Sequence, residues 1–88
     1  MIERIVTIVN KNGLHARPAA EIVKLAAKYQ AEVTIVRDDL EVNGKSIMGM
    51  MMLAAECGSE IIIRADGDDA GDAVNRLIGL VEQKFGEE

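Results

Sequence analysis

Two stretches of the chain carry apolar residues on only one side of a helix. In each, the apolar positions fall at i, i+3, i+4 and i+7, which is the spacing of one stripe along a helix. Such a helix is stable only when its stripe packs against another element of the fold. The two stripes are Ala19, Ile22, Val23 and Ala26, and Val74, Leu77, Ile78 and Val81.

The rest of the chain supplies strand-like segments that these stripes can cover. Segments 2–9, 31–37, 40–42 and 60–65 are rich in β-branched and other apolar residues, which favour strands. Ser46 is a suitable N-cap for a third, short helix running towards Ala55, and Asp68 or Asp69 could cap the last helix. The order βαββαβα predicts an α+β fold with helices on a single face of a sheet.

Composition restricts the functions that this fold could serve. The 88 residues fit one domain, residues 1–88, and 15 acidic against 10 basic residues give a net charge of −5, which disfavours nucleic acid as a partner. Cys57 is the only cysteine, so an internal disulfide or a multi-cysteine zinc site is excluded. No apolar run reaches the length of a membrane span. We therefore expect a cytoplasmic protein without membrane insertion.

The stretch most informative about chemistry is residues 13–20, which read GLHARPAA. His15 is the only histidine and stands where a turn cluster gives way to the first helix. The backbone amides of Ala16 and Arg17 lie in the first helical turn, where amides have no intrahelical partner and the helix dipole attracts anions. The Arg17 guanidinium adds a group that pairs with phosphate oxygens.

These groups together favour covalent phosphoryl acceptance. The dipole and Arg17 should disfavour the charged form of the His15 ring and leave it neutral and nucleophilic. A phosphoryl group accepted there would lie beside Ala16 and Arg17, so we assign His15 and Arg17 as the reactive pair. The same pattern also fits a histidine that caps the helix or lies on an ordinary surface, and it offers too few ligands for a metal site.

Residues 13–19 resemble the active-site motif of HPr, the histidine-containing phosphocarrier family of the bacterial phosphoenolpyruvate-dependent sugar phosphotransferase system. Residues 43–49, which read NGKSIMG, resemble the regulatory-serine segment of the same family, at the family's separation from the histidine. Chain length and element order also agree. The resemblance implies an open-faced β-sandwich, with a four-stranded antiparallel sheet and three helices on one face.

The resemblance also implies a role for each motif. His15 would accept phosphate on Nδ1 from phosphorylated enzyme I and pass it to the IIA domain of a sugar permease, while Arg17 steadies the phosphate. No cofactor is implied, and the chain would be a monomeric, stoichiometric carrier whose partners supply catalysis. Ser46 would be phosphorylated by HPr kinase/phosphorylase where that enzyme exists, although a plain N-cap also explains this serine.

The family docks its partners on a surface that we place on the first and second helices. We expect about half of the methionines at positions 48, 50, 51 and 52 to pack in the core. Lys24, Arg17 and Lys45 would make this region locally positive, which could steer acidic partners. The expected contact residues are Ala20, Lys24, Ala27, Ile47, Met48 and Met51.

Two other functions fit the sequence. An HPr-like regulatory protein would act in a nitrogen-related relay or in Ser46-dependent carbon catabolite control. A small-molecule-binding module would need a pocket between helices and sheet, which close-packed small residues such as Ala19 argue against. We expect no acid or base partner for His15, and we interpret Glu87 and Glu88 as a solvated chain end.

Overall fold

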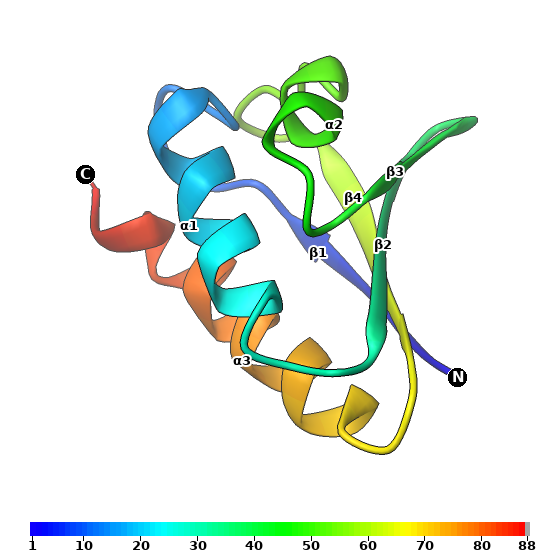
Figure 1. The fold of residues 1–88 in the computed structure, drawn as a ribbon. Coiled ribbons are helices and arrows are strands. Elements are labelled where there is room, and N and C mark those ends of the chain that lie inside the picture. The colour runs from blue at the N-terminus through cyan, green and yellow to red at the C-terminus, as the bar shows by residue number, and fades with distance from the viewer. Residues whose placement is uncertain (88) are drawn as a thin grey trace.

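A computed structural model describes residues 1–87 and shows the predicted element order (Figure 1). Two boundaries differ from expectation by more than one residue. The first strand ends at Thr7, because Ile8 bonds instead to Gly58 and Ser59 in a turn. The second helix ends at Met52, because Ala54 takes a φ of 50°, which an α-helix cannot continue. The elements are β1 (Ile2–Thr7), α1 (Ala16–Ala26), β2 (Glu32–Arg37), β3 (Leu40–Asn43), α2 (Ile47–Met52), β4 (Glu60–Asp66), α3 (Ala70–Glu82) and a 3₁₀ turn η1 (Lys84–Gly86).

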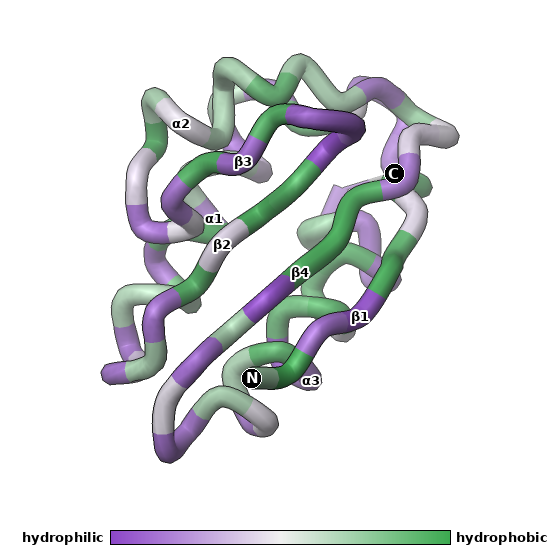
Figure 2. Tube along the Cα trace, turned by 90° about the vertical axis from the view of Figure 1, so that its right-hand side faces the viewer, coloured by the Kyte–Doolittle hydropathy of each residue, from purple (hydrophilic) through white to green (hydrophobic). Residues whose placement is uncertain are grey.

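The four strands form one antiparallel sheet in the order β1-β4-β2-β3. Figure 1 shows the helices on one side of this sheet, and Figure 2 shows its open face. This arrangement confirms the open-faced sandwich. Within residues 1–87, no helix has the length and apolar run needed to cross a lipid bilayer.

The space between sheet and helices is filled by the predicted stripes. Ile61 and Ile63 of β4 point inward, and they join Ile22 of α1 and Leu77 of α3 in a core where each side chain is fully buried. Because the described residues pack this layer with side chains, the structure gives no support to a small-molecule pocket there.

The short helix α2 buries fewer methionines than expected. Met50 is fully buried, whereas Met48, Met51 and Met52 are exposed, so the expectation that half would pack in the core is wrong. The reason is the length of α2, which spans only six residues and turns one position towards the core. Leu53, just after the helix, fills the adjoining core space.

Asp69 precedes α3 but does not cap it with its side chain, contrary to expectation. Its carboxylate instead accepts hydrogen bonds from the amides of Gln30 and Ala31, each at 2.9 Å. The Gln30 amide, and then that of Ala31, hold the pKa of the Asp69 carboxyl below its usual value despite the opposing effect of burial. Asp69 thus ties the start of α3 to the segment that enters β2.

We expect Asp69→Asn to lower the free energy of unfolding, because an amide offers one acceptor oxygen where the carboxylate offers two. The pKa of the Asp69 carboxyl is lower in the folded protein than in the unfolded chain. The stabilisation by its hydrogen bonds is therefore complete above the unfolded-state pKa of about 3.9, and it is lost as the pH falls through the folded-state pKa. Thermal unfolding at several pH values should show a gap between wild type and variant at pH 7 that narrows in acid. Exposed Asp68 provides the control, Asp68→Asn; a gap for Asp69→Asn that stayed constant into strong acid would contradict this role.

Candidate functional site

The loop that leads into α1 is held at three points. Asn10 donates from Nδ2 to the Gly13 carbonyl at 2.7 Å and accepts from the Gly13 amide at its own carbonyl at 3.1 Å. The Leu14 amide donates to the carbonyl of Ala55 at 2.8 Å. Because Asn10 is fully buried, the loop is fixed to the interior of the protein immediately before His15.

Glycine is required at position 13 for two reasons. Its φ of 69° lies in the left-handed region, which residues with a Cβ adopt at a cost. A Cβ at this position would also lie 2.6 Å from the carbonyl oxygen of Ala55. The glycine at the start of the sequence motif therefore lets the loop approach the 53–56 segment closely enough to be anchored by it.

His15 stands at the first position before α1, as predicted, but it does not cap the helix with its side chain. The Ala19 amide donates to the His15 carbonyl at 3.0 Å, which is the first hydrogen bond of the helix. The amides of Ala16 and Arg17 precede it and therefore have no acceptor within the helix. The His15 side chain is 39% exposed. This geometry contradicts the capping interpretation and leaves the ring accessible beside the amino end of α1.

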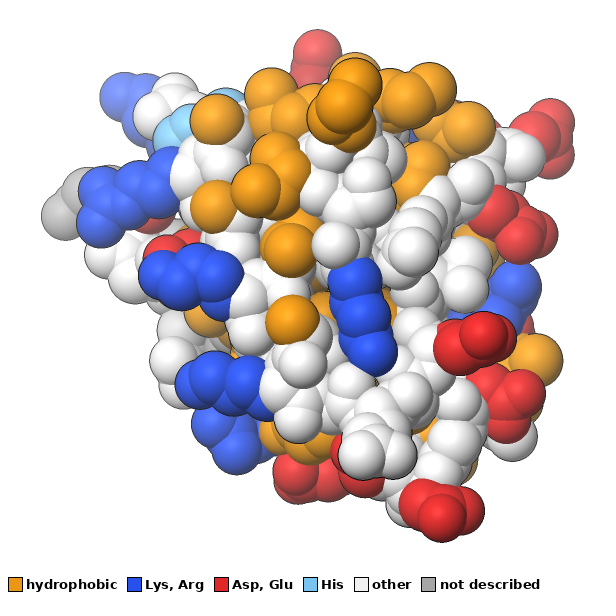
Figure 3. Space-filling model, in the orientation of Figure 1, with side chains coloured by type: hydrophobic (Ala, Val, Ile, Leu, Met, Phe, Trp, Pro, Cys, Tyr) orange, Lys and Arg blue, Asp and Glu red, His pale blue; other side chains and the backbone are white. Residues whose placement is uncertain are grey.

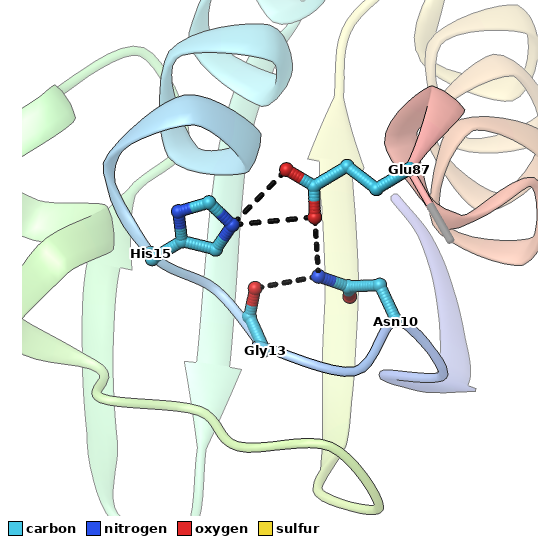
Figure 4. A network of polar contacts seen from close by, with 4 residues as sticks. All are labelled: Asn10, Gly13, His15 and Glu87. Carbon is cyan, nitrogen blue, oxygen red and sulfur yellow. Dashed lines mark hydrogen bonds and ion pairs between the residues drawn. The ribbon is translucent and has the colours of Figure 1, made fainter.

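A carboxylate that we expected to be solvated contacts the His15 ring. Nε2 of His15 lies 3.0 Å from Oε2 and 3.2 Å from Oε1 of Glu87, and the Glu87 side chain is only 15% exposed (Figure 4). Figure 4 shows the other ring nitrogen, Nδ1, on the side away from Glu87. The expectation that His15 has no acid or base partner is therefore wrong, and so is the interpretation of Glu87 as solvated. Glu88 lies outside the described residues.

The turn after α3 brings Glu87 to the histidine. Lys84, Phe85 and Gly86 all have positive φ values, of 59°, 56° and 78°, and this run reverses the chain. The Phe85 side chain is buried and fixes the turn to the core. The Glu87 amide then donates to the Lys84 carbonyl at 2.8 Å. These contacts aim the Glu87 side chain back at α1.

Glu87 is ionised at neutral pH. Burial alone would raise the pKa of its carboxyl, but hydrogen bonds from His15 and Asn10 and the charge of Arg17 outweigh burial and hold this pKa below its usual value. Asn10 contributes through its Nδ2, which donates to Oε1 at 3.1 Å. The structure therefore adds an ionised carboxylate to the helix dipole and Arg17 as a charged neighbour of the ring.

The remaining residues of the predicted phosphate site are placed as expected. Ala16 and Arg17 are both exposed in the first turn of α1, on the same helix end as the ring. Residues 1–87 contain no group of three or more histidine, cysteine or acidic side chains that could hold a metal ion. The amides of Ala16 and Arg17 thus lie at the same end of α1 as the ring, and Nδ1 points away from Glu87 (Figure 4).

The predicted docking surface is largely accessible. Figure 3 shows apolar side chains gathered over α2 and blue side chains along α1. Met52, which the sequence analysis did not assign to this surface, is 65% exposed, and Ala20 is half-buried. The surface residues predicted from the sequence and found exposed are Lys24, Ala27, Ile47, Met48 and Met51.

The positive charge of this region is partly compensated. Nζ of Lys24 lies 3.7 Å from a carboxylate oxygen of Glu21. Lys45 donates from Nζ to the Tyr29 carbonyl at 2.8 Å, near the carboxyl end of α1. Of the three cations grouped by sequence, Arg17 is the one that lies in the first turn of α1.

The comparisons with known proteins agree with this site. The family model described as the phosphorylation site of the PTS HPr component matches residues 2–83. The chain belongs to the HPr family. HPr from Cupriavidus necator is 44% identical over 87 residues, covering 99% of this chain and 98% of that protein. A crystal structure of HPr from Thermoanaerobacter tengcongensis matches with a TM-score of 0.96 at 45% identity, covering 100% of this chain and 99% of that one.

The similar proteins carry more than one name. NPr from Shewanella violacea is 41% identical and covers 98% of this chain and 94% of that protein. A crystal structure of Crh, a catabolite repression protein of Bacillus subtilis, is 38% identical with a TM-score of 0.77, covering 96% of this chain and 97% of that one. This chain is therefore a phosphocarrier of the HPr type, and its likeness extends to NPr and to a protein named for catabolite repression.

Proposed function

We propose that the chain carries a phosphoryl group on Nδ1 of His15, received from phosphorylated enzyme I and passed to the IIA domain of sugar permeases. The observation that supports this most strongly is the position of the His15 ring. The ring is accessible at the amino end of α1, and Glu87 contacts Nε2 while Nδ1 faces away (Figure 4). A phosphoryl donor can approach only the nitrogen that is left open.

The surroundings of the ring suit the loaded state. A phosphoryl group on Nδ1 would bring negative charge to the amino end of α1, where free amides and the dipole stabilise anions. The Arg17 guanidinium in the same turn would form charge-assisted hydrogen bonds with phosphate oxygens. Ala16 and Arg17 are therefore the proposed phosphate-binding residues.

The mode of action that we propose is stoichiometric. Residues 1–88 would act as one monomeric phosphocarrier domain in the cytoplasm, without a cofactor, and the partners would supply catalysis. Exposed apolar side chains of α2, with Ala20, Lys24 and Ala27 of the first helix, would dock enzyme I and IIA domains in turn. Flexible methionine side chains suit a surface that must fit several partners briefly.

Incubation with phosphoenolpyruvate and enzyme I should add one acid-labile phosphate to the wild-type chain, as read by intact mass, and none to His15→Ala. Arg17→Ala should load about 10- to 100-fold more slowly, because a charge-assisted hydrogen bond contributes about 1.5–3 kcal/mol. Arg4→Ala removes an exposed guanidinium on β1 and serves as the matched control. Loading of His15→Ala at the wild-type rate would contradict the proposal.

A regulatory role is the second candidate, and the likeness to NPr and Crh favours it. We propose Ser46 as a regulatory phosphorylation site. Its Oγ accepts from the Gly49 amide at 3.1 Å, and it directly precedes the exposed Ile47 and Met48. A phosphate there would suit the start of α2 and preserve the fold while adding a charge of about −1.5 to −2 to the docking surface.

Ser46→Asp should therefore bind enzyme I more weakly at low salt, and added salt should restore most of the affinity because it screens repulsion from an acidic partner surface. Titration calorimetry or fluorescence anisotropy at low and high salt gives the comparison. Asn75→Asp introduces the same charge on exposed α3 and is the control. An affinity loss that salt leaves unchanged would argue against repulsion.

A further inference from the structure

We propose that Glu87 is a positioning residue that holds the proton of His15 on Nε2, and so directs phosphoryl transfer to Nδ1 and stabilises the charge that the ring gains. This inference rests on the proposed phosphocarrier function. Glu87, expected from the sequence to be solvated, would then have a defined role.

For a neutral ring, the contact can form with only one of the two tautomers. An ionised carboxylate accepts hydrogen bonds and cannot donate them. Because both oxygens of Glu87 lie within 3.2 Å of Nε2, the proton of a neutral ring must reside on Nε2, and the lone pair is then on Nδ1. Without an acceptor on one side, a neutral imidazole exchanges its proton between the two nitrogens.

The hydrogen bond between the ring and Glu87 becomes stronger as the phosphoryl group is transferred. The Nδ1 lone pair forms the bond to phosphorus, while the bond from phosphorus to its atom on enzyme I breaks and its electron pair leaves with enzyme I. The proton on Nε2 stays, so the ring becomes positively charged. Glu87 then accepts a charge-assisted hydrogen bond from a cation, which is stronger than the bond to the neutral ring.

Contacts from separate parts of the chain hold Glu87 in this place. Buried Phe85 anchors the turn, and Asn10 donates to Oε1 at 3.1 Å. Lys84 and Phe85 adopt left-handed backbone conformations that cost free energy for residues with a Cβ. Such strain persists only where the surrounding structure compensates for it, and it often accompanies function. The same Asn10 also fixes the Gly13 carbonyl, so the histidine loop and Glu87 share one buried anchor.

The test compares Glu87→Gln with Glu82→Gln, a matched substitution of an exposed glutamate at the end of α3. Glutamine keeps the shape of the side chain but removes its charge. Initial rates of loading are measured at several concentrations of the carrier against phosphorylated enzyme I. We expect kcat for Glu87→Gln to fall about tenfold with little change in KM, because the effect arises in the transfer step and not in docking. Glu82→Gln should match wild type.

A spectroscopic readout separates positioning from general structural damage. With ¹⁵N-labelled histidine, NMR at a pH where the ring is neutral should show wild type and Glu82→Gln as the Nε2–H tautomer. Glu87→Gln should show a mixture, since an amide can donate to the ring as well as accept from it.

The outcomes distinguish failure of the phosphocarrier function from failure of the proposed role of Glu87. If wild type gains no phosphate, the phosphocarrier proposal itself fails. If wild type loads and Glu87→Gln keeps the control's kcat, or loses rate only through KM with an unchanged tautomer, the role of Glu87 is overturned while the carrier function stands.

Discussion

The hydrogen bond between Glu87 and Nε2 of His15 is the interaction on which the site depends. An imidazole offers two nitrogens of similar basicity, and a carrier that must be loaded and unloaded at one atom has to distinguish them. The structure distinguishes them by placing a carboxylate 3.0 Å from one and leaving the other open. Asn10, buried and bonded to both Glu87 and the Gly13 carbonyl, connects the two segments that make this arrangement possible.

The scaffold fixes the ring on the helical side of a single sheet. The His15 loop is anchored to Ala55, and α2 presents apolar side chains next to α1. The proposed reactive group and the proposed docking surface therefore lie on the same side of the sheet. Chain transfer needs complexes that form and separate quickly, and an accessible face of small and flexible side chains is suited to brief contacts.

The sequence predicts what depends on local periodicity and leaves out what depends on distant contacts. The one-sided stripes identify α1 and α3, and the turn before His15 places it at a helix start, because these signals lie within a few residues of each other. His15 and Glu87 are 72 residues apart, and no pattern near Glu87 marks it as different from a solvated end. Asp69 is similar: its position predicts an N-cap, while its partners, Gln30 and Ala31, come from another segment.

The methionines of α2 illustrate a different limit. Their spacing on a helix was clear, but how many are buried depends on where the helix stops, and Ala54 ends it through a backbone conformation that alanine seldom adopts. Side-chain burial in a short helix is thus set by its neighbours more than by its own sequence.

The position of phosphorus on the His15 ring of the loaded protein tests the role of the Glu87 contact most directly. Heteronuclear NMR of the ¹⁵N-histidine chain, loaded by enzyme I, assigns both ring nitrogens. We expect phosphorus bonded to Nδ1, with a proton retained on Nε2 beside the Glu87 carboxylate. Phosphorus on Nε2 would require the ring to break its contact with Glu87 and would contradict this role of the carboxylate.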